Sequence, residues 1–254
     1  MGVSAVDGWL ARAGRALWPP RCLVCGEPGS GGRDLCGACA AALPWNRHAC
    51  PTCAMPMPAA AAIPARAIAG GPAVTPQAPP CCGACLQRAP PLDAARAAFV
   101  YAFPLDRLLP RFKFHRDLAA GRLLVQAMSV AFRGLPRPDA LLPVPLHRAR
   151  LRSRGYDQAL ELARPLARAL SIPLRADLLR RTRATAPQSR LDAGGRQRNL
   201  RGAFTASPGA AALPAHVVLV DDVMTTGATL HAAALALRHA GVARVEAWVC
   251  ARVP

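Results

Sequence analysis

The stretch VVLVDDVMTTGATLHAAALALRHAG, Val217–Gly241, decides the fold of this chain. The stretch begins within a continuous apolar run, HVVLV (residues 216–220). Such a run is typical of a central parallel strand that is buried on both faces. Two adjacent acids, Asp221 and Asp222, follow the run, and a threonine-rich turn then leads into an apolar helical segment. A strand, a polar turn and a helix in this order predict an α/β unit with its ligand groups at the carboxyl end of the strand.

The turn between strand and helix has the composition of a phosphate cradle. Its residues are Thr225, Thr226, Gly227, Ala228 and Thr229. Their backbone N–H groups would carry the positive end of the helix dipole, and the glycine would allow close approach of a ligand. The preceding acids could accept ribose hydroxyls, help to hold Mg²⁺ or stabilise positive charge on an anomeric carbon. A helix cap needs only one such residue, whereas this stretch has two acids, three threonines and a glycine.

Strands and helices alternate over residues 93–254. Strands are predicted in ARAAFVYAF, DALLPVPL and ARVEAWVCARV, and helices in RFKFHRDLAAGRLLVQAMSVAF and DQALELARPLARAL. In the second helix the apolar residues recur on one face, and Pro165 should kink it. The predicted fold class is therefore α/β with a mostly parallel sheet.

Nine of the ten cysteines precede residue 86, mostly as C-x-x-C pairs. The pairs are Cys22/Cys25, Cys36/Cys39, Cys50/Cys53 and Cys82/Cys85. Two such thiolates can face one point, and four complete the tetrahedral sulfur shell that zinc prefers. We predict two structural Zn²⁺ sites in a small double zinc-ribbon domain, formed by consecutive pairs, while a cross-braced pairing stays open. Disulfides would need an oxidising compartment that nothing else in the sequence supports.

Two cysteines fall outside this pattern. Cys81 offers the last pair an alternative sulfur, but only Cys82 keeps the two-residue spacing to Cys85. Cys250 stands in an apolar stretch and is predicted to be a small core residue.

The chain divides into three regions. Residues 1–20 place apolar side chains on one side of a short helix and are interrupted by charges, which indicates an amphipathic helix rather than a secretory signal. Residues 21–92 form the cysteine-rich region, with an Ala/Pro-rich insert over 54–81 that carries no evident chemistry. Residues 93–254 form the α/β domain.

The composition is strongly basic, with 32 Lys and Arg against 14 Asp and Glu and a net charge of +18. Such a charge indicates anionic partners, either nucleic acid or phosphorylated metabolites. Lys113 is the one lysine, and Ala, Pro and Gly are abundant, so part of the arginine excess reflects a GC-rich genome. No apolar run of about 18 residues is present. We expect a cytoplasmic protein, with peripheral contact to the inner face of the membrane as an alternative.

The segment VVLVDDVMTTGATL resembles the phosphoribosyl pyrophosphate (PRPP) motif of type I phosphoribosyltransferases. Three further segments make the chain similar to the ComF family, which is associated with DNA uptake in natural transformation. They are the cysteine pairs after WPPRCLVCG, the segment LLPVPLHRARLRSRGYDQALELA, and the segment RTRATAPQSRLDAGGRQRNLRGAF. The similarity covers nearly the whole chain apart from the insert, and it implies a type I phosphoribosyltransferase-like domain after the zinc ribbons.

The resemblance assigns candidate roles to individual residues. It implies that Asp221 and Asp222 are the ribose-binding acids, with Mg²⁺ accompanying PRPP, and that residues 225–229 hold the 5′-phosphate. It places the pyrophosphate loop at Arg148, Arg152, Arg154 and Gly155, and a mobile flap at residues 182–199 with Gln188, Arg196 and Asn199. Asp157 stands where the family commonly has Asn; it can cap the following helix but adds negative charge near the pyrophosphate.

Three functions are compatible with these features. The first is a ComF-like protein that handles single-stranded DNA together with DNA-uptake or recombination proteins and carries a PRPP site. The second is an active phosphoribosyltransferase that transfers ribose 5-phosphate to a base or amine, and the third is a PRPP-sensing regulator. Because the chain ends soon after the last strand, we expect any acceptor pocket to come from the zinc lobe or the N-terminal helix. Phe112 and Phe114 are candidate platforms for stacked bases.

Overall fold

The structure, a computed structural model, describes residues 19–58, 81–183, 202–206 and 213–254. Residues 1–18 of the predicted amphipathic helix and residues 59–80 of the insert lie outside the described residues. The predicted flap residues Gln188, Arg196 and Asn199 lie outside them as well.

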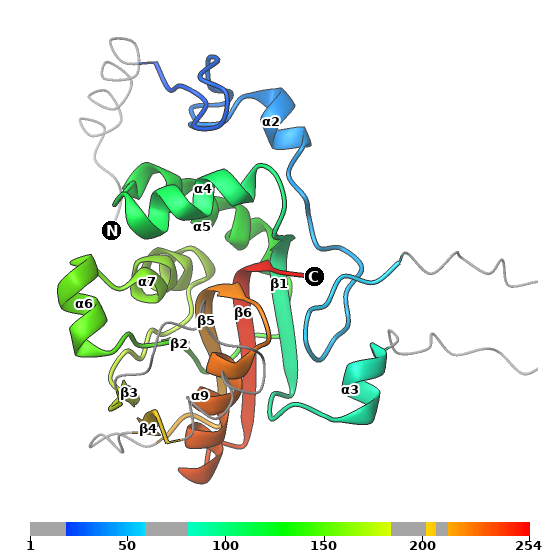
Figure 1. Cartoon of the computed structure of the whole chain (residues 1–254), viewed down its shortest axis with the longest axis vertical. Helices are drawn as coiled ribbons and strands as arrows, with labels where there is room; N and C mark the ends of the chain where they lie inside the picture. The colour runs from blue at the N-terminus through cyan, green and yellow to red at the C-terminus, as the bar shows by residue number, and fades with distance from the viewer. Residues whose placement is uncertain (1–18, 59–80, 184–201, 207–212) are drawn as a thin grey trace, which may run out of the picture.

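Four parallel strands form the central sheet (Figure 1). In spatial order they are β1 (Ala94–Val100), β6 (Arg244–Arg252), β5 (His216–Met224) and β2 (Ala140–Pro143). All three pairings are parallel, so the carboxyl ends of the strands meet at one edge of the sheet. The predicted α/β fold with a parallel sheet is confirmed. The strand that carries the acids is longer than its apolar run, because β5 continues through the acids to Met224.

Helices cover both faces of the sheet. One face carries α4 (Leu105–Phe114), α5 (Leu118–Phe132) and α7 (Gln158–Leu170), and the other carries α9 (Ala228–His239). Val218 and Val220 pack in the core beneath the first group, while Val217 and Leu219 pack beneath α9. The continuous apolar run of β5 therefore follows from burial on both faces.

Shorter elements complete the described chain. They are α2 (Gly37–Ala41), α3 (Gly83–Gln87), α6 (Arg148–Arg154), β3 (Leu179–Arg181) and β4 (Phe204–Ala206). The last two pair as an antiparallel hairpin. Because β3 and β4 join the core beneath α9 through Leu179 and Phe204, the ends of the segment 182–203 are anchored to the domain.

The basic stretch predicted as helical between residues 111 and 132 forms two helices. Arg116, between them, has a positive φ of 55°. Asp117 then caps α5, where its Oδ1 accepts a hydrogen bond from the backbone N of Ala120 at 3.0 Å. Lys113 and Phe114 are the last two residues of α4 before this turn. Pro165 lies within α7 without ending that helix.

The cysteine-rich region, called here the cysteine lobe (residues 19–58 and 81–92), packs onto the α/β domain. Cys22 and Leu35 join the core beneath α4 and α5, whereas Ala54 joins the core on the α9 face. The rings of Trp45 and Phe99 lie 4.7 Å apart between their centroids and connect the lobe to β1. The backbone N of Asn46 donates to Ala98 O at 3.0 Å, and that of Ala95 donates to Pro51 O at 3.0 Å, so the lobe lies along the β1 edge of the sheet (Figure 1).

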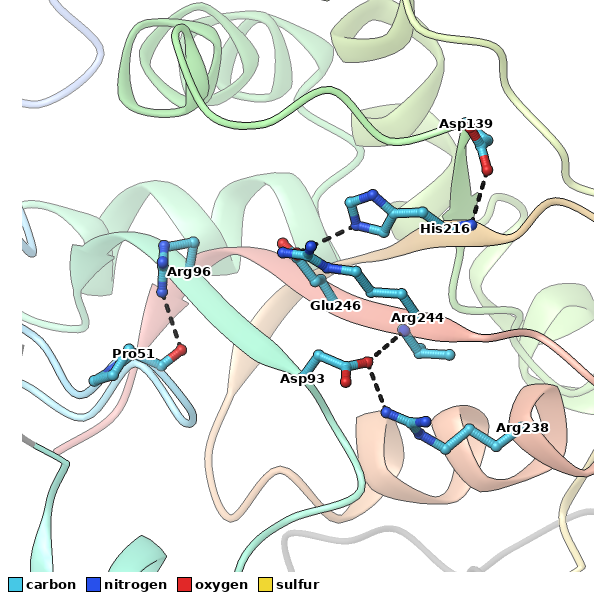
Figure 2. A network of polar contacts seen from close by, with 9 residues as sticks. Pro51, Asp93, Arg96, Asp139, His216, Arg238, Arg244 and Glu246 are labelled. Atoms are coloured by element: carbon cyan, nitrogen blue, oxygen red, sulfur yellow. Dashed lines mark hydrogen bonds and ion pairs between the residues drawn. The ribbon is translucent and has the colours of Figure 1, made fainter. Parts of the chain in front are cut away.

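Acidic side chains organise the amino edge of the sheet (Figure 2). Asp93 Oδ2 accepts the backbone N–H of Val245 at 2.7 Å and lies 2.6 Å from the guanidinium group of Arg238. Glu246 Oε1 lies 2.6 Å from Arg244 Nη2 and 3.2 Å from His216 Nε2. These acids are engaged with the ends of strands and helices, which indicates a structural role for this edge.

Within the described residues, every helix falls short of the length or the apolarity that a membrane span requires.

Candidate functional site

A cavity of about 700 Å³ opens at the carboxyl edge of the sheet. Its charged lining consists of Lys113, Arg150, Arg154, Asp157, Arg181, Asp221 and Asp222. Its apolar lining includes Tyr101, Leu109, Pro110, Phe114, Val144, Val223 and Val253. This carboxyl-edge cavity lies where β2 and β5 are neighbours and the helices after them lie on opposite faces of the sheet. In open α/β sheets, ligands usually bind in the crevice between two neighbouring strands whose connections leave to opposite faces of the sheet.

The two adjacent acids, called here the acid pair, differ in environment because side chains alternate along β5. Asp222 lies two residues after Val220 on β5, so its side chain points to the same face of the sheet, toward α4. There its Oδ2 lies 2.8 Å from Lys113 Nζ. Its Oδ1 accepts the backbone N–H of Val223 at 2.7 Å. Asp221 Oδ1 accepts the backbone N–H of Asp222 at 2.9 Å. The two carboxylates thus have separate partners at the end of one strand.

Burial and the nearby charge of Asp222 together raise the pKa of Asp221 to about 8, while Lys113 opposes the shift. The carboxyl group of Asp221 therefore keeps its proton to a higher pH than an ordinary aspartate does. A carboxyl group that keeps its proton can donate a hydrogen bond as well as accept one.

Residues 225–229, called here the threonine loop, follow β5 directly and begin α9. Thr225 and Thr229 line the carboxyl-edge cavity. Thr226 is exposed, and its Oγ1 accepts the backbone N–H of Ala228 at 3.4 Å. Thr225 and Thr229 thus bring hydroxyl groups and the start of α9 to the side of the acid pair.

Gly227 is required at the turn for two reasons. Its φ is +77°, a left-handed conformation that side chains disfavour. A Cβ at this position would lie 2.7 Å from Met224 Cε and 2.8 Å from His231 Nε2. Burial lowers the pKa of His231 to about 4, so a neutral imidazole packs against the turn at neutral pH. The sequence predicted the need for a glycine here, but not the histidine behind it.

The segment predicted as a pyrophosphate loop is largely a helix, α6. The helix determines which of its arginines face the cavity and which face the solvent. Arg150 and Arg154 are four residues apart, so they share one face of α6, and both line the cavity. Arg148 and Arg152 are exposed and are not among the lining residues. Sequence reasoning missed Arg150, although helical spacing from Arg154 would have found it.

Gly155 ends α6 in a left-handed conformation with φ of +82°. The neighbouring Arg154 donates a hydrogen bond to Gln158 Oε1 at 2.9 Å, and its guanidinium carbon lies 5.5 Å from the ring centre of Phe114. Asp157 caps α7 as predicted, since its Oδ1 accepts the backbone N–H of Leu160 at 3.1 Å. Its Oδ2 accepts the N–H of Leu146 at 3.0 Å, so this acid also shapes the loop after β2.

Arg181 is a second cavity residue that sequence reasoning missed. It belongs to β3 and is 8% exposed, and its guanidinium carbon lies 5.3 Å from the ring centre of Phe204 on β4. Burial lowers its pKa, whereas the charge of Asp221 acts in the opposite direction. The pairing of β3 with β4 brings this arginine to the cavity. It is the first residue of the segment RTRATAPQSRLDAGGRQRNLRGAF, but the family resemblance assigned it no role.

The cysteine sulfurs gather in two groups, each within 4.8 Å. The first cysteine group is Cys22, Cys25, Cys36 and Cys39, and the second is Cys50, Cys53, Cys82 and Cys85. This is the consecutive grouping, and its second member uses Cys82 rather than Cys81. Separations of 3.7 Å between Cys25 and Cys36 and 3.5 Å between Cys53 and Cys82 approach the roughly 3.8 Å between sulfurs around a tetrahedral zinc ion.

Backbone N–H groups point at sulfurs in both groups, as expected of thiolates that bind metal. The N–H of Cys39 lies 3.4 Å from Cys36 Sγ, and the N–H of Cys82 lies 3.4 Å from Cys50 Sγ. Burial raises the pKa of Cys50, but N–H donors outweigh it and lower that pKa to about 6. The donor set and its geometry therefore fit structural Zn²⁺. Cys250 is fully buried, which confirms it as a core residue.

Comparisons with known proteins agree with this two-part architecture. Residues 13–86 match the family model described as a double zinc ribbon domain, and residues 157–254 match the phosphoribosyl transferase domain. The DNA utilization protein YhgH of Salmonella typhi is 37% identical over 224 residues, which cover 86% of this chain and 90% of that protein. Competence protein F of Haemophilus influenzae is 37% identical over 178 residues, which cover 67% and 78% of the two chains. The chain belongs to the ComF family.

Two further comparisons are more distant. Another ComF-family relative, competence protein ComFC of Bacillus subtilis, is 30% identical over 151 residues, which cover 58% of this chain and 59% of that protein. Among solved structures, a glutamine PRPP amidotransferase from B. subtilis matches 51% of this chain and 24% of its own, with 23% identity and a TM-score of 0.33.

Proposed function

We propose that this ComF-family protein binds PRPP or a related phosphoribosyl ligand in the carboxyl-edge cavity. One observation carries the proposal, namely that the acid pair and two residues of the threonine loop, Thr225 and Thr229, line the same cavity as Arg150, Arg154 and Arg181. The acids suit ribose hydroxyls, the loop suits the 5′-phosphate, and arginine forks suit pyrophosphate oxygens. The match of residues 157–254 to a phosphoribosyl transferase domain supports this assignment.

Mg²⁺ would accompany the pyrophosphate group of PRPP. It prefers phosphate and carboxylate oxygens and commonly reaches a protein together with its phosphate ligand. Asp221 offers such an oxygen within the cavity once its carboxyl group is deprotonated.

The proposal is tested by the thermal stability of the protein with PRPP and Mg²⁺. We expect the melting temperature to rise in the wild type, because a ligand that binds only the folded state stabilises it. The double variant Asp221→Asn with Asp222→Asn should lose this rise, and circular dichroism of the ligand-free variant would check that it is folded. A wild type without any rise over millimolar PRPP would refute the proposed site.

A second candidate function is phosphoribosyl transfer, favoured by the apolar wall of the cavity. Among the described residues this wall comes from α4, the ends of β1 and β6, and the loop after β2; the cysteine lobe lines no part of it. The expectation that an acceptor pocket would come from that lobe therefore finds no support in the described cavity. In the reaction, the bond from the anomeric carbon to pyrophosphate breaks, a bond to an acceptor nitrogen forms, and that nitrogen loses a proton. Pyrophosphate release with a panel of bases and amines tests this function.

We further propose that the protein handles single-stranded DNA. Relatives named for DNA utilization and for competence support the proposal, as does the net charge of +18. Phe112 is buried and makes an edge contact with Tyr156, with 5.9 Å between the ring centres, so it is a core residue. Phe114 is 64% exposed and lines the cavity beneath Arg154. Of the two candidate platforms, the structure leaves Phe114 accessible to a base.

The chain offers a matched control for this platform. Phe103 is 50% exposed and also has an arginine, Arg107, 5.4 Å from its ring centre, but it does not line the cavity. We expect Phe114→Ala to weaken binding of single-stranded oligonucleotides by about 1–3 kcal/mol, and Phe103→Ala to change it little. Binding should also weaken with salt, since phosphates release counterions. An affinity that does not change with salt concentration, or an equal loss of affinity in both variants, would contradict the proposal.

A further inference from the structure

Lys113 is the one lysine in a chain that otherwise uses arginine for its positive charge. It lies in the last turn of α4, and both of its neighbours in sequence along the helix are aromatic. Phe112 is buried in the core, and Arg111 donates to Asp117 Oδ2 at 2.9 Å and to the carbonyl of Leu23 at 2.5 Å. The end of α4 is therefore held by the core, by α5 and by the cysteine lobe. These contacts fix the position of the Lys113 backbone.

The ammonium group of Lys113 occupies a specific place beside the acid pair. It lies 2.8 Å from Asp222 Oδ2, and the side chain of Asp222 is 8% exposed. A carboxylate so deeply buried needs a compensating charge, since removing one partner of a buried pair is strongly destabilising. Because Asp222 Oδ1 already accepts the N–H of Val223, both oxygens of this acid have partners.

A lysine suits this position better than an arginine would. Its ammonium group is a compact charge on a flexible stem and has three donors, so it can contact a carboxylate and ligand oxygens together. A bound divalent cation beside two carboxylates would offer the same combination of small size and positive charge. Lys113 also lines the cavity, so a ligand held by the acid pair would lie within its reach.

We infer that Lys113 is a positioning residue that supplies, beside the acid pair, the positive charge that a divalent cation would otherwise bring. The ribose phosphate part of the ligand is then bound without metal, and Mg²⁺ is needed only for the pyrophosphate group. This inference rests on the proposed phosphoribosyl site. It predicts different metal requirements for two ligands that share a sugar and a 5′-phosphate. Ribose 5-phosphate should bind without Mg²⁺, whereas PRPP should need Mg²⁺ for its pyrophosphate group.

The experiment measures the affinity of the full-length protein for ribose 5-phosphate by calorimetry, with and without millimolar Mg²⁺. The metal-free buffer is prepared with a chelating resin rather than a free chelator, so that zinc stays bound. We expect the wild type to bind equally well in both buffers. Lys113→Met should bind at least tenfold more weakly without Mg²⁺ and should recover a large part of the loss when Mg²⁺ is added. Lys113→Arg keeps the charge and should bind without metal.

The outcomes distinguish the inference from the proposed function. If the wild type binds ribose 5-phosphate only with Mg²⁺, or if Lys113→Met matches the wild type, the inference is wrong although the site stands. If neither ribose 5-phosphate nor PRPP binds the wild type in either buffer, the proposed site itself is wrong. A purely structural role would weaken binding in Lys113→Met equally in both buffers, which also overturns the inference. Should that variant not fold, Lys113→Gln, which also removes the charge, takes its place in the two buffers.

Discussion

The guanidinium group of Arg252 donates a hydrogen bond to the carbonyl of Cys53 at 3.0 Å and so ties the last strand to the second cysteine group. A second N–H of the same side chain donates to the carbonyl of Met224 at 3.3 Å, immediately before the threonine loop. Arg252 is 6% exposed. Its burial lowers its pKa, and the nearby thiols, among them Cys53, oppose the shift. One buried side chain therefore connects the cysteine lobe to the candidate ligand site.

Replacing Arg252 with Met should lower the free energy of unfolding and weaken PRPP binding. The variant keeps most of the side-chain volume but removes the donor for three carbonyl groups, those of Cys53, Met224 and Val253. A buried carbonyl group left without its donor costs about 1–3 kcal/mol. Urea denaturation followed by circular dichroism measures the change. Arg107→Met, at an exposed position of α4, is the control and should stay within about 0.5 kcal/mol of the wild type. Equal stability of the two variants would argue against the connection.

Two adjacent cysteines test the composition of the second cysteine group. Cys82→Ser should remove one of two zinc ions per chain, because Cys82 is one of the four sulfurs of that group. Cys81→Ser should keep both, since Cys81 lies outside the group and its Sγ is 3.5 Å from Thr52 Oγ1. Elemental analysis of the purified proteins measures the zinc content. The prediction fails if the two variants lose the same amount of zinc.

Asp221→Asn should stabilise the ligand-free protein more at high pH than at low pH. The pKa of Asp221 rises from 3.8 to about 8 on folding, so the folded protein holds the proton more tightly. The stability of the wild type should therefore fall as pH rises between these two values. Asparagine has no proton to lose and can keep the acceptor for the N–H of Asp222.

The measurement for Asp221→Asn is the melting temperature of wild type and variant from pH 4 to pH 9. The difference between the two proteins should grow with pH up to about 8 and then level off. A difference that stays constant over this range would mean that Asp221 has an ordinary pKa in the folded protein.

Gly227→Ala should destabilise the fold and abolish ligand binding. The left-handed φ of +77° alone costs an alanine of order 1 kcal/mol, and its Cβ would also press on Met224 and His231. Gly241→Ala is the matched control, because its φ is +101° and a Cβ there would meet no heavy atom of the described residues within 4 Å. Thermal unfolding and PRPP-dependent stabilisation should therefore separate the two variants, and binding by Gly227→Ala at wild-type strength would contradict the packing argument.

Much of the fold could be predicted from the sequence because it depends on local spacing. A continuous apolar run followed by a polar turn and a helical segment specifies a buried parallel strand and its helix wherever the unit packs. The C-x-x-C pairs likewise bring two sulfurs together over four residues. Asp157 was correctly predicted as a cap, since capping involves only the next few residues.

The sequence alone determined the α/β class, the pairs of cysteines, and the acid pair with its threonine loop, because each is encoded within one short segment. Tertiary structure alone decided that Lys113 meets Asp222, that Arg181 reaches the cavity, and that consecutive cysteine pairs combine. The physical reason is that these contacts join separate elements. Periodicity shows which side of a helix or strand faces the core. Only the packing of the elements against one another decides which side chains from different elements come into contact.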